Sequence, residues 1–530
     1  MYPATHAAVT PDKAAVVMAG SGTALTYREL DERSARFANA LAAAGLRRGD
    51  GLALLAENDQ RCFEVYWAAL RSGLYVTPVN HHLSPDEVAY IVDDCGAAAL
   101  VVSTRHAGLA ASIVAATPRV RRRFVFRSAG DAPEAAGGLT GHDDYEAALA
   151  AVPAARPEVE WAGADMLYSS GTTGRPKGIR PPLPEYRLGE PGMVLPPLVQ
   201  MFYGMGPDTV YLSPAPVYHA APLRFGGAVQ ALGGTVVVME RFDPVDALAA
   251  IERYRVTHSQ WVPTMFVRML KLPEADRARF DLSSHRVAVH AAAPCPPDVK
   301  RAMMAWWGPI LHEYYAATEG AGITFASPAE WLARPGTVGR SALGTLHVCD
   351  ERGSELATGE DGIVYFEREK VPFTYHGDEA ATAAGQHPLH PTWTTVGDVG
   401  HLDADGYLYL TDRAKFMIIS GGVNIYPQEI ENVLALHPKV LDVAVIGIPD
   451  PEMGERVHAV VEPAPGVEPG PDVADELIAF VRDRIAHYKA PRGVDFVDEL
   501  PRTPTGKLRK GVLRERYWSA SPVATAPTAG

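Results

Sequence analysis

The sequence predicts an α/β protein with a large N-terminal domain and a smaller C-terminal domain. In the first third of the chain, short apolar runs alternate with stretches of helical spacing, a pattern typical of parallel βα units. The apolar runs are residues 52–56, 75–79 and 98–102, and the helix-like stretches are 62–72 and 85–94. The chain has 530 residues, more than one ordinary hydrophobic core holds, so we expect at least two domains.

The first long helix is predicted from a capping motif. Thr26 precedes Glu29 by three residues, which is the spacing of a capping box, and apolar residues then recur at helical spacing until Gly45. Residues 128–160 are rich in Ala, Gly, Pro and Asp without lasting periodicity. We therefore expect surface loops and helix fragments there, and no chemistry.

The alternation of apolar runs and helical stretches starts again after about residue 415. Residues 443–448 and 457–462 predict strands, and a helix is predicted near 472–486, where apolar residues form one stripe. These elements indicate a separate C-terminal domain. Residues 519–530 are small, polar and aperiodic, so we expect a disordered tail.

Composition and charge exclude several classes of protein. Lys and Arg number 49 against 63 Asp and Glu, a net charge of −14, so there is no overall electrostatic footprint for nucleic acid. The four cysteines form no CxxC pair or Cys/His cluster, which favours buried free thiols over zinc or disulfides. No stretch approaches the roughly 18 uninterrupted apolar residues of a membrane span. We expect a cytoplasmic protein, because no signal-peptide pattern follows Met1.

The most informative segment is the loop 168–178, YSSGTTGRPKG, which packs hydroxyls and glycines before a lysine. Glycines let backbone N–H groups approach phosphate oxygens, hydroxyls donate further hydrogen bonds, and Lys177 adds a mobile cation, so the loop is suited to a polyphosphate. It is not a Walker A loop, because Pro176 stands where that pattern has Gly and Gly178 where it has Ser or Thr. A flexible Ser/Gly linker is the alternative interpretation.

This loop resembles the signature loop of the adenylate-forming superfamily: acyl-CoA synthetases, luciferases and peptide-synthetase adenylation domains. Five further segments resemble motifs of that superfamily, in its order: 315–319 (YAATE), 396–398 (VGD), 412–415 (DRAK), 421–425 (GGVNI) and 504–507 (PTGK). The likeness is greatest to the acyl-CoA synthetases. It implies an N-terminal adenylation domain over 1–413 that includes a distorted β-barrel. It also implies a hinge at 414–416, centred on Lys415, and a mobile α+β lid over 417–518.

The resemblance also implies ATP as a substrate, with Mg²⁺ and coenzyme A. Lys507 would reach the α-phosphate and the acid from the lid, Thr318 would contact phosphate, and Glu319 would hold Mg²⁺. Gly421 and Gly422 would line the pantetheine tunnel. The other ATP or AMP residues that it implies are Ser169, Ser170, Gly171, Thr172, Thr173, Gly174, Lys177, Ala292, Ala293, Pro294, Tyr315, Ala316, Asp398 and Arg413. Core packing, a surface ion pair or a simple turn are the structural alternatives at several of these positions.

The acid-binding side is predicted around His219, which resembles the residue beside the carboxylate pocket and is expected to position the acid. The acyl-pocket residues are His219, Ala220, Gly226, Gly227, His290, Ala291 and Ala316. These small residues leave volume, and Arg224 is the one added charge. We therefore predict a bulky, largely apolar acid: a fatty acid, an aryl acid, or a polycyclic terpenoid or steroid carboxylate. The proline-rich segment 180–197 predicts an irregular excursion over the substrate side.

The sequence therefore predicts an AMP-forming acid–CoA ligase, which makes acyl-AMP and pyrophosphate first, then acyl-CoA and AMP. One alternative is an acyl-AMP ligase that loads the pantetheine of a carrier protein. Another is a non-catalytic nucleotide or acyl-CoA sensor that kept the fold. The expected partners are the carboxylic acid, ATP and CoA, without nucleic acid, and a homodimer is left open.

Overall fold

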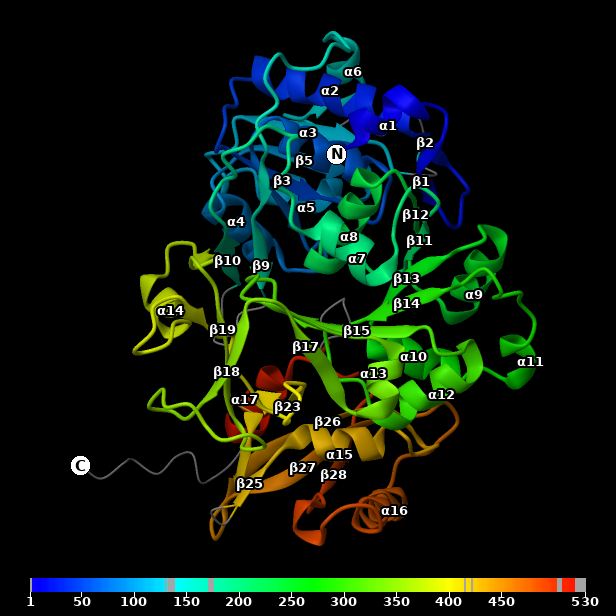
Figure 1. Ribbon diagram of the computed structural model, residues 1–530, viewed down its shortest axis with the longest axis vertical. Helices are drawn as coiled ribbons and strands as arrows, with labels where there is room; N and C mark the ends of the chain where they lie inside the picture. The colour runs from blue at the N-terminus through cyan, green and yellow to red at the C-terminus, as the bar shows by residue number, and fades with distance from the viewer. Residues whose placement is uncertain are drawn as a thin grey trace.

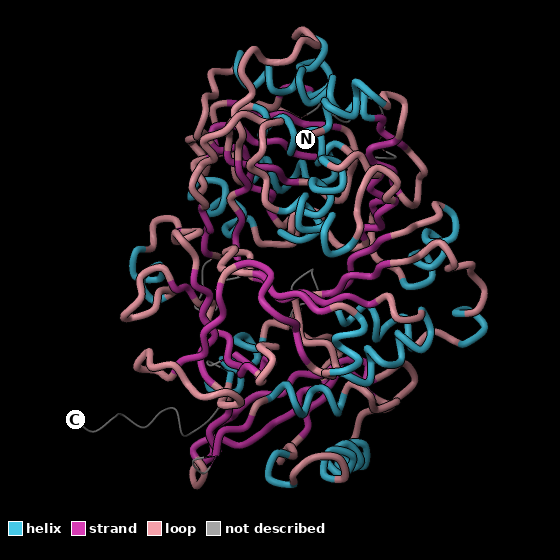
Figure 2. The backbone as a smooth tube through the Cα atoms, viewed as in Figure 1, coloured by secondary structure: helices cyan, strands magenta, loops and turns pink. Residues whose placement is uncertain are grey.

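The computed structural model describes residues 2–128, 131, 139–169, 176–413, 416–420, 423–502 and 508–519. The protein is a mixed α/β molecule, as predicted, with its N-terminal elements at one end and its C-terminal elements at the other (Figure 1). In the N-terminal part, strands run through the interior and helices lie outside them (Figure 2). The hydrogen-bonded paths of the described strands are open, so the distorted barrel remains a prediction.

A parallel sheet of six described strands forms the N-terminal part, in the order β7-β6-β5-β3-β4-β8. Its strands are β3 (Gly51–Leu55), β4 (Tyr75–Val79), β5 (Ala97–Ser103), β6 (Arg122–Phe126), β7 (Asp143–Asp144) and β8 (Ala164–Asp165). The helices of this part are α1 (Pro3–Val9), α2 (Tyr27–Ala43), α3 (Arg61–Arg71), α4 (Pro85–Asp94), α5 (Ala107–Ser112) and α6 (Tyr145–Ala150). Every residue of β3, β4 and β5 is buried, as expected for parallel strands covered on both faces. The predicted βα units are therefore confirmed.

The predicted capping motif begins α2. The Thr26 side chain accepts a hydrogen bond from the Glu29 backbone N–H, and the Glu29 carboxylate accepts one from the Thr26 backbone N–H. Two backbone donors that the first helical turn leaves open are thus satisfied. After α2, Gly45 adopts the left-handed φ of 85° that favours glycine, at the end the spacing predicted.

A long sheet continues through the middle of the molecule, in the order β18-β19-β22-β23-β17-β16-β15-β14-β13-β11-β12-β1-β2, with β21 paired to β19. Its strands are β1 (Ala14–Met18), β2 (Ala24–Thr26), β11 (Val210–Ser213), β12 (Thr235–Val238), β13 (His258–Trp261), β14 (Val287–His290), β15 (Leu311–Ala316), β16 (Ile323–Ala326), β17 (Thr337–Leu343), β18 (Thr345–Cys349), β19 (Gly362–Glu367), β21 (Trp393–Thr394), β22 (Asp398–Leu402) and β23 (Leu408–Arg413). The strands from β11 to β15 run parallel, and from β15 to β16 the direction reverses. The associated helices are α7 (Leu195–Tyr203), α8 (Ala220–Ala231), α9 (Pro244–Arg253), α10 (Pro263–Leu270), α11 (Glu274–Arg277), α12 (Pro297–Trp307) and α13 (Pro328–Ala333).

A small antiparallel sheet joins distant segments of the chain. It pairs β10 (Lys177–Arg180) with β9 (Leu167–Ser169) on one side and β20 (Thr374–Tyr375) on the other, and α14 (Glu379–Ala384) follows β20. This pairing brings the residues just after the predicted phosphate loop beside the segment around Tyr375.

The C-terminal part has a sheet of its own, in the order β25-β24-β27-β26 with β28 paired to β27. Its strands are β24 (Ile418–Ser420), β25 (Val423–Ile425), β26 (Val440–Asp450), β27 (Gly454–Pro463) and β28 (Val494–Phe496), and its helices are α15 (Pro427–Leu434), α16 (Pro471–Arg482) and α17 (Lys510–Ser519). The two predicted strands are β26 and β27. The predicted helix ends at Arg482, not at 486, because a turn follows it, yet Ile485 still packs on the same core.

The four cysteines are free, and three of them are buried. No helix within the described ranges is both long and apolar enough to cross a membrane. The prediction of free thiols is confirmed. The tail from 520 onward lies outside the described residues.

Candidate active site

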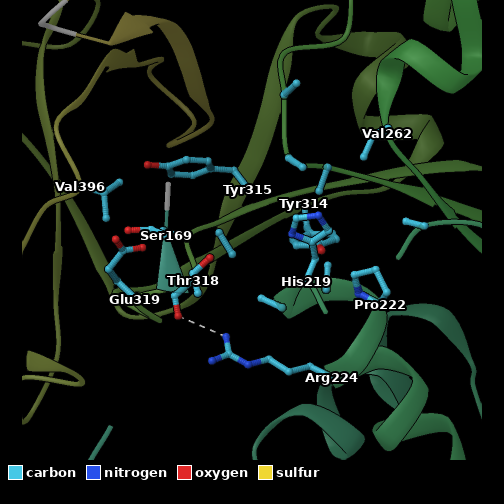
Figure 3. A pocket seen from close by; sticks show the side chains of 18 of the residues that line it. Ser169, His219, Pro222, Arg224, Val262, Tyr314, Tyr315, Thr318, Glu319 and Val396 are labelled. Carbon is cyan, nitrogen blue, oxygen red and sulfur yellow. Dashed lines mark hydrogen bonds between the residues drawn. The ribbon is translucent and has the colours of Figure 1, made fainter. Parts of the chain in front are cut away.

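One cavity of about 1690 Å³ gathers segments from the middle and C-terminal parts of the chain. The middle part contributes residues of α8, β13 and β15 and the loop Ala291–Pro294, while the C-terminal part contributes Phe416, Tyr426 and Leu508. Figure 3 shows His219, Pro222 and Tyr314 on one side of this cavity and Tyr315, Thr318, Glu319 and Val396 on the other. Residues predicted from widely separated motifs thus meet around a single space.

Tyr315 and Asp398 are in direct contact, although the two motifs lie far apart in the sequence. The Tyr315 hydroxyl donates to Asp398 Oδ2 at 2.7 Å, and the Tyr315 ring stacks at 6.1 Å from that of Phe366. Asp398, the first residue of β22, is 9% exposed. This hydrogen bond holds the Tyr315 ring at one wall of the cavity and places the buried Asp398 carboxylate at the same wall.

The loop Ala292–Pro294 also lines the cavity, and Ala292 has an unusual backbone conformation. Its φ is 76°, in the left-handed region that costs a non-glycine residue about 1 kcal/mol or more. Just before it, the Ala291 backbone N–H donates to the Trp261 carbonyl at 3.3 Å, which anchors the loop to β13. The strained conformation turns the loop toward the cavity that Tyr315 lines.

Thr318 and Glu319 lie in the turn between β15 and β16, and each is held by a side chain from elsewhere. Arg224 of α8 donates to the Thr318 carbonyl at 3.3 Å and pairs through Nε with Asp165 Oδ2 at 2.7 Å (Figure 3). The Tyr375 hydroxyl donates to Glu319 Oε1 at 2.8 Å. Both contacts orient the turn without using the Thr318 hydroxyl.

Lys177 completes this side of the cavity. Its Nζ lies 5.3 Å from the centre of the Tyr375 ring and 3.6 Å from Asp378 Oδ2. Because β10 and β20 are paired, Lys177 and Tyr375 come to the same edge as Glu319. The Lys177 ammonium and the Glu319 carboxylate therefore both lie beside Tyr375.

The donor set around Glu319 fits Mg²⁺ held mainly by a substrate. Among the described residues, no group of three or more His, Cys, Asp or Glu side chains could hold a metal ion, and Glu319 Oε2 accepts no hydrogen bond. Magnesium is commonly bound by one or two carboxylates together with substrate phosphates and water. One available carboxylate oxygen beside a predicted phosphate loop matches that pattern.

Several predicted site residues lie outside the described residues. These are Ser170, Gly171, Thr172, Thr173, Gly174, Lys415, Gly421, Gly422 and Lys507, together with the side chain of Arg413. Neighbours of two of these segments do line the cavity: Ser169 and Lys177 flank the phosphate loop, and Leu508 follows Lys507.

On the acid side, most of the predicted small residues line the cavity. His219 is the N-cap residue of α8, and its ring centre lies 4.5 Å from that of Tyr218. Ala220, Ala291 and Ala316 line the cavity with it. The irregular segment from Pro181 to Val194 also contributes lining residues, as its prolines predicted.

Gly226 and Gly227 do not line the cavity, which differs from the prediction. A Cβ atom on Gly226 would lie 2.5 Å from the Phe63 ring, and one on Gly227 would lie 2.8 Å from the Tyr66 ring. The two glycines are buried where α8 packs on α3, so the space they leave is filled by aromatic side chains. Sequence alone does not indicate which face of a helix a small residue occupies.

His290 also lies away from the cavity wall. It is fully buried, and its Nε2 lies 3.4 Å from Glu313 Oε2, which in turn accepts a hydrogen bond from Lys300 Nζ at 2.6 Å. Burial, with the nearby Lys300 charge, holds the pKa of His290 well below its ordinary value. The residue belongs to a buried polar cluster behind the Ala291–Pro294 loop.

Tyr375, Tyr314 and Gln260 line the cavity but were not predicted from the sequence. Tyr375 lies in the weakly patterned segment after β19, where no motif drew attention to it. Tyr314 directly precedes Tyr315 in β15, and strand alternation could have indicated that it faces the opposite side. No sequence signal marked Gln260.

Comparisons with known proteins agree with this geometry. The model of the family described as AMP-binding enzyme matches residues 4–376, and that of the AMP-binding enzyme C-terminal domain matches 429–507. A feruloyl-CoA synthase of Amycolatopsis sp is 36% identical over 519 residues, covering 97% of this chain and 98% of the relative. A fatty acid–[acyl-carrier-protein] ligase, ScoC, of Streptomyces coeruleorubidus is 31% identical over 523 residues, covering 97% and 96%.

A solved structure shares the fold over nearly the whole chain. The anthranilate CoA ligase AuaEII, determined in complex with anthranoyl-AMP, matches with a TM-score of 0.83 at 24% identity, covering 98% of both chains. The family matches, the full-length relatives and the common fold agree with the motifs that meet at the cavity. This chain belongs to the AMP-binding enzyme family and is an adenylate-forming enzyme.

Proposed function

We propose that this enzyme is an AMP-forming acid–CoA ligase for a bulky, largely apolar carboxylic acid. The observation that carries the proposal is one cavity bordered by the Tyr315–Asp398 pair, by Lys177 and Glu319, and by an apolar wall around His219. The full-length likeness to a feruloyl-CoA synthase supports an acid–CoA ligase.

In the proposed reaction, one oxygen of the acid's carboxylate attacks the α-phosphorus of ATP and pyrophosphate leaves. The thiol of CoA then attacks the acyl carbonyl carbon, loses its proton, and AMP leaves with the original carboxylate oxygen. A free carboxylate is a poor electrophile, and AMP is a better leaving group than oxide or hydroxide, so two easier steps replace one difficult step.

The nucleotide would bind at the wall formed by Tyr315 and Ala292–Pro294. A flat aromatic ring and small apolar groups suit the two faces of adenine, and Asp398 could accept hydrogen bonds from ribose hydroxyls. The loop from Ser169 to Lys177 would hold the phosphates, with Thr318 beside them. Arg413 and Lys507 are proposed for ribose and α-phosphate contacts from the family resemblance.

Glu319 would hold Mg²⁺ together with phosphate oxygens. The ion would supply positive charge that offsets the charge developing on the phosphates during transfer. Tyr375, through its hydrogen bond of 2.8 Å, would keep the Glu319 carboxylate turned toward that position.

We further propose that residues 417–518 form a lid that moves about a hinge at 414–416, relative to an adenylation domain over 1–413. Arg502 and Leu508, the described residues on either side of the segment that contains Lys507, both line the cavity. This arrangement suits the adenylating step. In the second step, Gly421 and Gly422 would line the path of the CoA pantetheine arm.

The test is pyrophosphate release with Mg-ATP across a panel of acids, from acetate through fatty, aryl and polycyclic carboxylates, each with and without CoA. Acid-dependent release with CoA-dependent turnover and a thioester product is expected. Release without any acyl-CoA would contradict CoA as the acceptor, and the best rate with acetate would contradict a bulky acid.

A second candidate function is the loading of a carrier protein, because ScoC, named as a fatty acid–[acyl-carrier-protein] ligase, matches 97% of this chain. The same pyrophosphate assay, with a pantetheinylated carrier protein in place of CoA, separates the two. Acylation of the carrier but not of CoA favours this candidate.

A further inference from the structure

We propose that Tyr314 determines acid specificity by donating a hydrogen bond to an oxygen substituent on a ring of the acid. The substrate class is then an oxygen-substituted aryl acid, not an unsubstituted fatty acid. The inference rests on the proposed function, and it concerns a residue outside the motifs that carry the family resemblance.

Strand geometry places Tyr314 on the acid side of the cavity. In β15, Tyr315 contacts Asp398 and Phe366 on one face, so Tyr314 points to the other face, toward α8. There its ring stacks on Phe225 of α8 at 5.6 Å and an interplanar angle of 25°. Phe225 and Tyr314 both line the cavity, where their stacked rings form an aromatic wall.

A chain of hydrogen bonds crosses the sheet on this face and ends at Tyr314. Tyr211 of β11 donates its hydroxyl proton to Gln260 Oε1 at 3.0 Å, and Gln260 Nε2 donates to the Tyr314 oxygen at 2.9 Å. Register explains the alignment: Gln260 lies opposite Val289, which lies opposite His312, two residues before Tyr314 on the same face. The buried end of the chain, Tyr211, is fully covered.

The direction of this chain leaves one donor at the cavity. Because the Tyr314 oxygen accepts from Gln260, its own O–H proton remains to be donated, and no described residue accepts it. Tyr314 is partly buried and packs against an apolar cluster, so a ligand that fills the space beside it and offers no acceptor leaves this proton unsatisfied. A saturated acyl chain has no such acceptor, whereas a hydroxyl, methoxy or keto oxygen on a ring does.

The neighbouring surface favours a ring over a flexible chain. Phe225 also stacks on Tyr211 at 6.3 Å, and Tyr66 lines the same cavity. Flat aromatic side chains pack well against a planar ring and add attraction beyond area burial. The wall and the donor together recognise a planar ring that carries an oxygen.

The experiment compares matched acids in which an oxygen substituent is exchanged for carbon of similar size. The acids are benzoates and cinnamates in matched pairs. At each ring position, one pair compares a hydroxyl with a methyl group, and another compares a methoxy with an ethyl group. We measure kcat/KM for acid-dependent pyrophosphate release with the wild type, with Tyr314→Phe, and with Tyr407→Phe. Tyr407 is the matched control, because its hydroxyl also makes one hydrogen bond, to Glu330 at 2.9 Å, away from the cavity.

In the wild type, we expect about a tenfold or greater preference for the oxygen-bearing acid in at least one pair. Tyr314→Phe should bring that ratio to within about twofold of 1 by slowing only the oxygen-bearing acid, and Tyr407→Phe should keep the wild-type ratio. If the wild type is active but shows no preference for the oxygen-bearing acid in any pair, the assignment is wrong, whether or not the variant folds. The assignment is also wrong if Tyr314→Phe retains the wild-type preference. Absence of acid-dependent pyrophosphate release in the wild type overturns the proposed function itself.

Discussion

Tyr314 and Tyr315 are consecutive residues of β15, yet their hydroxyls serve opposite sides of the cavity. The Tyr315 hydroxyl donates to Asp398, and the Tyr314 oxygen accepts from Gln260. Because successive side chains of a strand point to opposite faces, the end of one strand separates the proposed nucleotide site from the proposed acid site. Substitutions at these two positions should therefore affect different substrates.

Tyr315→Phe is expected to raise the KM for ATP about tenfold and to leave the choice between acids unchanged. The substitution removes a hydrogen bond to a buried carboxylate, a contact worth about 1.5–3 kcal/mol that helps to orient Asp398 toward the proposed ribose site. Steady-state kinetics with ATP varied at saturating acid measure it. Tyr517→Phe, which removes an exposed phenol–aspartate bond to Asp495, is the control. An unchanged KM for ATP would place the nucleotide elsewhere.

Glu319→Gln is expected to lower ATP–pyrophosphate exchange by about 100-fold and to raise the Mg²⁺ concentration needed for half-maximal rate. The amide cannot supply the anionic oxygen that the ion prefers. Tyr375→Phe keeps the carboxylate and removes its 2.8 Å donor, so a smaller change in the same direction is expected. Glu360→Gln, a surface carboxylate, is the control. A Mg²⁺ titration that coincides for Glu319→Gln and the wild type would exclude Glu319 as the ligand.

Lys300→Met should destabilise the protein by about 3–5 kcal/mol, because it leaves the Glu313 carboxylate buried without its partner. Lys300 Nζ lies 2.6 Å from Glu313 Oε2, and the two side chains are 0% and 6% exposed. Urea unfolding followed by fluorescence measures the loss. The double variant Lys300→Met/Glu313→Leu should recover much of it, since no charge remains buried. If the double variant is no more stable than the single one, the charge pair is not the cause.

Much of the architecture could be predicted because it depends on local pattern. The apolar runs that became β3, β4 and β5 are short, continuous and bounded by turns, which parallel strands covered on both faces require. The motif residues Tyr315, Thr318, Glu319 and Asp398 could be predicted for a different reason: their order and spacing resemble a known superfamily. Their meeting at one cavity was an expectation that the fold now supports.

The errors concern side-chain direction, which a single sequence leaves open. Gly226 and Gly227 make space for α3 and not for a ligand, because the packing angle of two helices decides which face is covered. His290 faces a buried charge cluster, while the next residue, Ala291, lines the cavity. Tyr375 reaches Glu319 only through the pairing of β10 with β20, a contact between segments almost 200 residues apart.

Stability is expected to fall as the pH is lowered from about 6.5 to about 4. Burial lowers the pKa of His81 and of His312 to about 4 and that of His285 to about 3, so these rings stay neutral in the folded protein. In the unfolded chain they bind protons below about 6.5. The unfolded state thus binds more protons within this range, and its free energy relative to the folded state decreases as the pH falls.

The measurement is urea unfolding at a series of pH values, for the wild type and for His285→Gln. Glutamine can keep the hydrogen bond that joins His285 Nε2 to Ser259 Oγ at 2.6 Å, but it does not titrate. The variant should therefore lose less stability between pH 6.5 and 4 than the wild type does. Equal slopes would show that His285 does not contribute to the acid sensitivity.

Lys271→Met is expected to slow acyl-AMP formation about three- to tenfold while leaving thioester formation from supplied acyl-AMP unchanged. Lys271 follows α10, and its Nζ donates to the backbone carbonyls of Val440 at 2.5 Å and Leu441 at 3.2 Å, at the start of β26. These bonds hold the C-terminal part in the arrangement that puts Leu508 at the cavity. Removing them should reduce the population of that arrangement, and only the step that uses it should slow.

Lys439→Met, which loses an exposed pair with Glu476 nearby, is the control. Stopped-flow measurement of each half-reaction distinguishes the cases, and an equal slowing of both steps would contradict a role of Lys271 in holding one pose.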